Sequence, residues 1–260
     1  MTVPRFTNMK SEGRKITMLT AYDYPMAAML DETEVDGILV GDSMSMVVQG
    51  HETTLPVTFE EVLYHARAVA RGTQYAHLVA DLPFMAYQVS KEQALTSAGR
   101  MMKDGGVGAV KMEGGERITE SVFACTQAGI PVMGHVGLLP QYAVNFKTKG
   151  KNINQRKAIL EDAIVLSKCG VFAIVIECVI ESLAKEITNK VKVPTIGIGA
   201  SRHCDGQILV TDDMIGLSNF HPKFVRKYSN VRKMIESSVK KYSQDIKNKK
   251  FPSSNNVYNK

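Results

Sequence analysis

Residues 109–115 read Ala109-Val110-Lys111-Met112-Glu113-Gly114-Gly115, a short apolar segment with charged residues near its end and two glycines after it. Comparable apolar segments recur at intervals of about 20 to 40 residues, with helical patterns between them, which is the rhythm of alternating strands and helices. We predict strands at residues 15–20, 37–40, 77–80, 109–112, 131–134, 172–176, 195–198 and 207–210. Eight parallel strands separated by helices predict an α/β fold, the (β/α)8 TIM barrel.

The clearest helix starts are capping boxes. Thr58 precedes a helical stretch with Glu61 three residues later, and Ser90 with Gln93 repeats the pattern. Two glycines at 105–106 stop the second of these helices. Further helices are expected at residues 119–128, 155–169 and 180–189.

The 260 residues fit one barrel domain, because such barrels commonly run to about 250 residues undivided. We expect residues 1–14 to form a helical cap at the barrel floor and residues 214–247 to form two C-terminal helical pieces separated near residues 229–230. Residues 248–260 are polar enough to be expected as a disordered tail.

Composition indicates a globular protein that stays in the cytoplasm. No apolar run is long enough to span a membrane and the first residues lack the apolar stretch of a secretion signal, so no membrane partner is expected. The four cysteines form no C-x-x-C pair.

The net charge of +6 comes from residues 221–260, which hold 11 Lys or Arg against 2 Asp or Glu. A basic tail can bind a polyanion, but a solvated helix is the commoner meaning, and we do not expect a nucleic-acid partner.

Three carboxylates follow consecutive predicted strands. They are Asp42, Asp81 and Glu113. Strand ends meet at one mouth of a parallel barrel, and converging carboxylates raise one another's pKa unless a cation is present. An oxygen-loving ion such as Mg2+ fits best, bound directly by Asp42 and Asp81 and through water by Glu113. A 2-oxo acid could then chelate the ion.

The next predicted strands add His135 and Glu177 to the same rim. Glu177 is our candidate for the base that removes a proton next to a polarised keto group. Lys111 or Ser43 could hold the substrate carboxylate, and His135 could donate a hydrogen bond to it. Each residue alone has an ordinary structural interpretation, such as a helix N-cap or an ion-pair partner. Their coincidence on consecutive strand ends favours a site.

The same residues lie in stretches that resemble the ketopantoate hydroxymethyltransferase family. These stretches are TMLTAYDY from residue 17, VGDSMSMVVQGHETTLPVT from 40, ADLPFMAY from 80, VKMEGGE from 110, PVMGHVGLLPQ from 131, IECV from 176, IGIGAS from 196, DGQILV from 205 and PKFVRKY from 222. They cover most of residues 15–228, and several of them together are highly specific.

The resemblance implies that a Mg2+-stabilised enolate of 3-methyl-2-oxobutanoate attacks the methylene carbon of 5,10-methylenetetrahydrofolate. The product would be 2-dehydropantoate (ketopantoate), on the route to pantothenate and coenzyme A. By motif match, Asp42, Asp81 and Glu113 would bind metal, and Asp42, Ser43, Asp81 and Lys111 would contact substrate. His135 would lie near the substrate and Glu177 would accept the proton. The family also implies a large homo-oligomer, often a decamer.

The chain departs from the family pattern in several places. Met44, Ser45, Ile180 and Ser201 replace the usual residues, and residues 145–151 replace a glycine-rich segment. We expect this loop to border the mouth and to affect folate use. Two alternatives stay open at this point. One is a Mg2+-dependent α-oxo-acid lyase or mutase of the phosphoenolpyruvate mutase and isocitrate lyase kind, and the other is an inactive barrel with a polyanion-binding tail.

Overall fold

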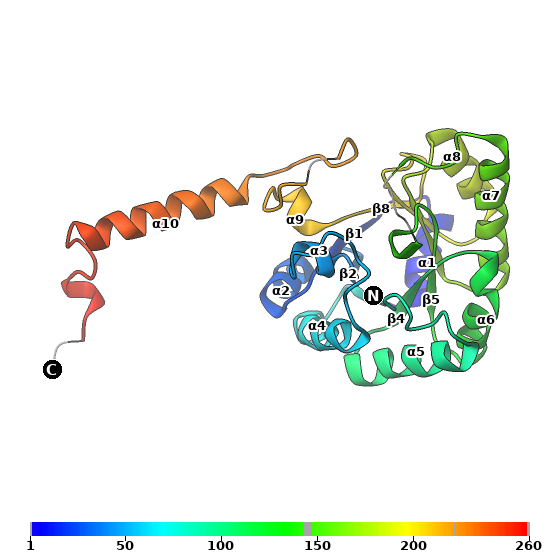
Figure 1. Cartoon of the computed structure of the whole chain (residues 1–260), viewed down its shortest axis with the longest axis horizontal. Helices are drawn as coiled ribbons and strands as arrows, with labels where there is room; N and C mark the ends of the chain where they lie inside the picture. The colour runs from blue at the N-terminus through cyan, green and yellow to red at the C-terminus, as the bar shows by residue number, and fades with distance from the viewer. Residues whose placement is uncertain (1, 143–146, 221, 259–260) are drawn as a thin grey trace. The chain divides into compact units, whose positions relative to one another are not determined.

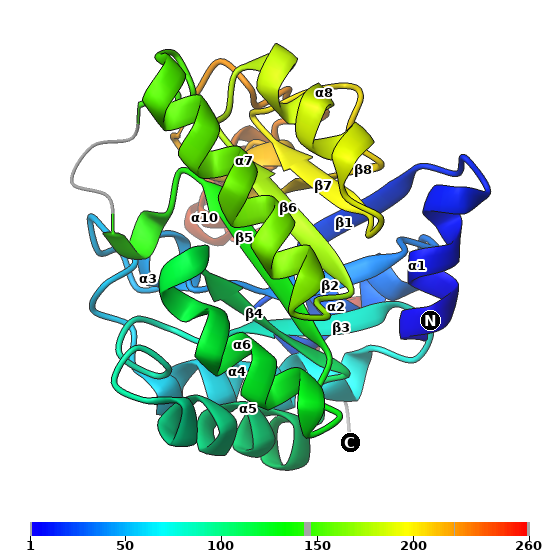
Figure 2. The same ribbon diagram turned by 90° about the vertical axis from the view of Figure 1, so that its right-hand side faces the viewer.

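A computed structural model describes residues 2–142, 147–220 and 222–258. The chain forms two compact units, Met1–Val210 and Thr211–Lys260. The first unit holds a closed barrel of eight parallel strands in sequence order (Figures 1 and 2). The predicted (β/α)8 barrel is therefore confirmed, and the extension of one domain over residues 1–260 stays a prediction.

The strands lie close to their predicted positions. They are β1 (Ile16–Thr20), β2 (Gly37–Val40), β3 (His77–Asp81), β4 (Ala109–Glu113), β5 (Val132–Gly137), β6 (Ala173–Glu177), β7 (Thr195–Ile198) and β8 (Gly206–Leu209). The main difference is at β5, which continues through His135 to Gly137 instead of ending before it. β6 continues beside it, and Gly137 pairs with Glu177.

Helices of the first unit connect the strands and cover the barrel. They are α1 (Val3–Ser11), α2 (Tyr24–Glu32), α3 (Met44–Val47), α4 (Phe59–Gly72), α5 (Lys91–Gly105), α6 (Thr119–Gln127), α7 (Ile153–Lys168) and α8 (Glu181–Lys190), with short 3-10 helices η1 (Glu116–Ile118) and η2 (Pro140–Tyr142). Figure 2 shows α7 running along β5 and β6, which it contacts. The Thr58 capping box is present in full, and Ser90 caps α5 as predicted.

The floor of the barrel is closed by α1. Phe6 and Met9 of this helix are buried in the hydrophobic cluster inside the barrel, and the Phe6 ring packs edge-on against Phe172. Lys10 on the same helix donates to a carboxylate oxygen of Asp205 at 2.9 Å. The predicted N-terminal cap is thus held by apolar burial and by an ion pair.

Inward-facing side chains change from apolar to polar toward the carboxyl ends of the strands. Val79, Ala109, Met133 and Val175 belong to the buried cluster. Because side chains alternate across a strand, the residue two positions later faces the same way. Those residues are Asp81, Lys111, His135 and Glu177. The fold therefore places four of the predicted site residues directly above the apolar core.

The second unit contains α9 (Thr211–Met214), α10 (Val231–Lys247) and the 3-10 helix η3 (Ser254–Asn256). The prediction of a helix from residue 214 to about 229 was wrong, because the described residues from 215 to 230 contain turns and irregular backbone. Gly216, at a φ of +69°, takes the chain out of α9. The α10 helix begins after Asn230, as predicted, and that side chain caps it.

Candidate active site

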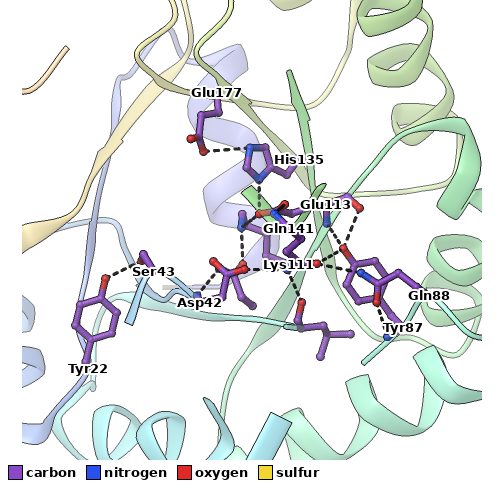
Figure 3. Close-up of polar contacts among 12 residues, drawn as sticks. Tyr22, Asp42, Ser43, Tyr87, Gln88, Lys111, Glu113, His135, Gln141 and Glu177 are labelled. Atoms are coloured by element: carbon purple, nitrogen blue, oxygen red, sulfur yellow. Dashed lines mark hydrogen bonds and ion pairs between the residues drawn. The ribbon is translucent and has the colours of Figure 1, made fainter. Parts of the chain in front are cut away.

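The predicted site residues come together at the carboxyl ends of β2 to β6. Asp42 follows β2, Asp81 ends β3, and Lys111 and Glu113 lie on β4. His135 lies on β5 and Glu177 ends β6. The strand register explains the contacts, because Asp81 is paired with Lys111 and Glu113 with His135. Figure 3 shows the polar contacts of this cluster.

Asp81 and Lys111 form a buried ion pair. The Lys111 Nζ lies 2.5 Å from the Asp81 Oδ1, and both side chains are nearly inaccessible to solvent. The other oxygen of Asp81, Oδ2, accepts a hydrogen bond of 2.9 Å from the backbone N–H of Asp42. A Cβ at Gly41 would lie 2.7 Å from the Ser43 hydroxyl, so a larger residue there would displace the Ser43 side chain. Burial lowers the pKa of Lys111, but Asp81, Glu113 and Asp42 outweigh it and raise that pKa overall.

His135 lies between two carboxylates. Its Nδ1 is 3.4 Å from Glu113 and its Nε2 is 3.3 Å from Glu177. Neither contact has the geometry of a hydrogen bond, although both ring nitrogens are buried. Burial and Lys111 lower the pKa of His135, but the two carboxylates dominate and raise it to about 9. The imidazole is therefore protonated at neutral pH and screens Glu113 from Glu177.

The carboxylates differ in their access to solvent. The Glu177 side chain is 15% exposed, whereas that of Glu113 is 1% exposed and that of Asp81 is 3% exposed. Among the described residues, Glu177 has one ion-pair partner, His135. Glu177 is thus the carboxylate of this cluster that a small molecule entering the mouth can reach most easily.

Two residues without a predicted role complete the site. The side chain of Gln141, in η2, donates 2.9 Å and 3.0 Å hydrogen bonds to the Asp42 Oδ2 and the Leu82 carbonyl. The Tyr87 hydroxyl lies 2.8 Å from the Gln141 Oε1 and 2.9 Å from the Glu113 carbonyl. Both residues fall in the family-like stretches, but a single glutamine or tyrosine in a loop carries no signal of its own.

Ser43 lies beside a tyrosine at the mouth, and its predicted contact with substrate stays a prediction. Its hydroxyl lies 2.8 Å from the Tyr22 hydroxyl, at the end of the cluster away from Glu177 (Figure 3). Ser43 is half-buried, so its oxygen can still reach a ligand in the mouth.

The cluster is short of positive charge. Four carboxylates, from Asp42, Asp81, Glu113 and Glu177, face one lysine and one histidine. Burial, followed by repulsion from Asp81 and Glu113, raises the pKa of Asp42 well above its usual value. A divalent cation would relieve this repulsion. In the part of the chain that the structure describes, no three His, Cys, Asp or Glu side chains form a ready metal site. The nearby donors are carboxylate oxygens, which suit an ion such as Mg2+ that takes one or two carboxylates directly and completes its shell with water and substrate.

The altered loop at 145–151 lies partly outside the described residues, which exclude Asn145 and Phe146. Its second half is joined to the segment that follows Glu177. The Lys149 N–H donates to the Cys178 carbonyl at 2.7 Å, and the Ile180 N–H donates to the Lys149 carbonyl at 3.1 Å. Cys178 itself has a φ of +48°, a conformation that costs energy for a residue with a side chain. The loop thus helps to hold the backbone next to Glu177.

No helix of the described residues is long and apolar enough to cross a membrane.

Comparison with known proteins gives one consistent family. Residues 1–254 match the sequence profile described as Ketopantoate hydroxymethyltransferase. The 3-methyl-2-oxobutanoate hydroxymethyltransferase of Syntrophus aciditrophicus is 52% identical, with 94% of this chain and 91% of that protein covered. The protein of the same name from Clostridium botulinum (strain Langeland) is 48% identical, with 99% and 95% covered.

Solved structures with the same fold are more distant in sequence. A phosphonopyruvate hydrolase crystallised with oxalate and Mg2+ has a TM-score of 0.65 at 14% identity, with 98% of this chain and 93% of that chain covered. A phosphoenolpyruvate phosphomutase from Streptomyces platensis has a TM-score of 0.63 at 12% identity, with 95% and 88% covered. At these identities the likeness shows the barrel alone.

Proposed function

This chain belongs to the ketopantoate hydroxymethyltransferase family and is a 3-methyl-2-oxobutanoate hydroxymethyltransferase, and on that basis we propose how its site performs the transfer. The one-carbon donor is 5,10-methylenetetrahydrofolate and the product is 2-dehydropantoate. In the transfer, C3 of the keto acid loses a proton and forms a bond to the donor carbon. That carbon gives up its bonds to the two folate nitrogens, which take up the C3 proton and one proton of the water that supplies the hydroxyl group.

Asp42 and Asp81 are the residues that would hold Mg2+ directly, with Glu113 acting through water. A bound Mg2+ supplies Lewis acidity at the keto oxygen, which makes the hydrogen on the neighbouring carbon more acidic. Lys111 and Ser43 bind and orient the substrate carboxylate, since both lie beside the Asp42 and Asp81 pair. Each of these assignments rests on the donor chemistry of the cluster and on the motif match.

Glu177 is the general base that accepts the C3 proton. The observation that carries this assignment is its position, separated from Glu113 by His135 and more open to solvent than the other carboxylates. A carboxylate bound to the cation would be a poorer base, because its electron pairs would be shared with the metal. His135 donates a hydrogen bond to bound substrate and lies between Glu113 and the base.

The experiment is NMR of the protein in D2O with Mg2+, 3-methyl-2-oxobutanoate and the folate donor. Wild-type protein should exchange the C3 hydrogen for deuterium and form 2-dehydropantoate. Glu177→Gln should lower the exchange rate by about 10²-fold to 10⁴-fold, the usual contribution of a general base, with unchanged Mg2+ affinity. Glu181→Gln is the matched control, because that carboxylate lies just beyond β6 but faces Arg202 on the surface.

The outcomes separate the parts of the proposal. Exchange at the wild-type rate by Glu177→Gln would refute the role of Glu177. Exchange by the wild type without product would refute the folate donor and direct attention to the 145–151 loop. A folded wild-type protein that gives neither signal would refute the proposed reaction.

The protein would act in the cytoplasm as a homo-oligomer, and a decamer is the assembly that the resemblance implies. The apolar residues of α10 recur at helical spacing, and a second copy of the chain would cover the face that they form. They are Met234, Ile235, Val239, Tyr242 and Ile246. Light scattering after size exclusion tests the proposal, and a monomer mass of 28.6 kDa at micromolar concentration would refute it.

A further inference from the structure

Gln141 is the most highly connected neutral side chain of the site, and the residue is only 3% exposed. Its Nε2 donates to the Asp42 carboxylate at 2.9 Å and to the Leu82 carbonyl at 3.0 Å. Its Oε1 accepts from Gln88 at 3.0 Å and lies 2.8 Å from the Tyr87 hydroxyl. An amide has two donors and two acceptor positions, so its capacity is filled.

Its backbone reaches a second carboxylate. The Gln141 N–H donates to the Glu113 Oε2 at 3.0 Å. One residue of the loop after β5 therefore contacts two of the carboxylates assigned to the metal, one through its side chain and one through its main chain. Figure 3 shows Gln141 between Asp42 on one side and Tyr87 on the other.

We propose that Gln141 is a positioning residue that fixes the Asp42 carboxylate for a divalent cation. This inference rests on the metal site of the proposed function. Asp42 lies beyond the end of β2, so the strand ladder does not hold it. Gln141 engages its Oδ2, and no hydrogen bond or ion pair from the residues that the structure describes reaches its Oδ1. The amide thus fixes the rotamer of Asp42 and leaves one oxygen for the cation.

Tyr87 and Gln88 determine which way the amide points. The Gln88 Nε2 donates to Oε1 at 3.0 Å, and the single Tyr87 O–H proton is shared between Oε1 and the Glu113 carbonyl, so Nε2 faces Asp42 and Leu82. In the flipped orientation the amide oxygen would lie against the Leu82 carbonyl, which has no proton, and the amide N–H groups would face the donors of Tyr87 and Gln88. Tyr87 is buried and also accepts a 3.0 Å hydrogen bond from the Glu113 N–H, so its hydroxyl is itself fixed. The orientation of Gln141 is therefore set before any ligand binds.

A structural role for Gln141 predicts a different result from a positioning role. Loss of hydrogen bonds in a loop lowers stability but leaves the metal affinity of the folded protein unchanged. Loss of an outer partner of a metal ligand weakens metal binding, typically by 10-fold to 100-fold. The two roles can be separated because stability without metal and affinity for metal are measured independently.

The test compares Mg2+ affinity, by calorimetry and by Mn2+ competition in electron paramagnetic resonance, with thermal unfolding in EDTA. Gln141→Ala keeps the backbone bond to Glu113 and should raise the Mg2+ Kd by about 10-fold to 100-fold. Saturating Mg2+ should restore much of kcat. Gln93→Ala is the matched control, because the Gln93 amide bonds Val89 and Met85 in the preceding loop without touching a carboxylate. Its Tm should fall while its Mg2+ Kd stays at the wild-type value.

Wild-type Mg2+ affinity in folded Gln141→Ala would overturn the inference. If that variant does not fold, Tyr87→Phe decides, since it removes a hydroxyl that orients the Gln141 amide and should raise the Mg2+ Kd. An unchanged Kd in folded Tyr87→Phe would then overturn it. Absence of Mg2+ binding by the wild type would refute the proposed metal site and the positioning role with it. The same Mg2+ Kd in the wild type and in the folded variants would refute the positioning role alone.

Discussion

Replacing Lys111 by Met should destabilise the metal-free protein strongly. The methionine keeps most of the length and apolar volume of the lysine stem, so the main change is the loss of the ammonium group. Lys111 lies 2.5 Å from Asp81 and 3.8 Å from Glu113, with its side chain 5% exposed. Without it, two buried carboxylates lose their shared cation.

The size of the effect follows from burial. Breaking a buried ion pair by removing one partner costs about 3 to 5 kcal/mol, because the remaining charge is left uncompensated. For a protein of this size, each kcal/mol lowers Tm by about 2 to 4 °C, so a fall of about 6 to 20 °C is expected. The matched control is Lys157→Met, whose ammonium lies 4.0 Å from Glu161 with both side chains well exposed. Such a surface pair contributes only about 0 to 1 kcal/mol.

The assay is thermal unfolding of both variants and the wild type by circular dichroism in EDTA at neutral pH. Lys111→Met should show the large fall, and Lys157→Met should stay within about 4 °C of the wild type. Equal, small shifts in the two variants would show that Lys111 does not neutralise the buried carboxylates, and the predicted cost of an uncompensated buried charge would be refuted.

Three further predictions concern the same region. Asp81→Asn should weaken Mg2+ binding and substrate binding together. Mg2+ at a hundredfold its wild-type Kd should stabilise the wild type by about 2.7 kcal/mol and the variant by less. Unchanged Mg2+ affinity by calorimetry would count against direct ligation by Asp81. Gly137→Ala should lower the free energy of unfolding, measured with denaturant, by about 1 to 3 kcal/mol and should slow C3 exchange. The reason is that Gly137 has a φ of +100° and that a Cβ would lie 2.4 Å from the Glu177 carbonyl. Wild-type stability and activity would contradict this. Burial, with a smaller effect from Glu177, raises the pKa of Cys178 from 9.0 to about 12. This thiol should therefore stay largely unlabelled by iodoacetamide at pH 8 and react faster as the pH rises. Mass spectrometry measures the labelling, and a rate equal to that of the unfolded chain would refute the prediction.

The strand positions could be predicted because each strand carries its own local signal. The segments around Asp81 and Glu113 are apolar runs of strand length that end in a charged residue, and the capping boxes at Thr58 and Ser90 mark helix starts with local hydrogen bonds. The region after Met214 had no such signal. A helical pattern of side chains was present there, but the positive φ of Gly216 and the irregular backbone that follows depend on packing, which a local pattern does not report.

The candidate site divides in the same way. Asp42, Ser43, Asp81, Lys111, Glu113, His135 and Glu177 could be grouped from the sequence, because residues at the carboxyl ends of parallel strands must meet at one mouth. The sequence could not predict which of these residues contact each other. The pairing of Asp81 with Lys111 and the placement of His135 between Glu113 and Glu177 depend on the register between strands.

The sequence by itself determined the barrel, the family and the residues that carry charge into the mouth. The tertiary structure alone decided how those charges are balanced and which neutral groups hold them. Gln141 and Tyr87 lie 54 residues apart and have no local pattern that marks them, yet they meet beside Asp42 and Glu113. The physical reason is that hydrogen bonds between loops depend on positions in space, whereas strand and helix formation depends largely on neighbours along the chain.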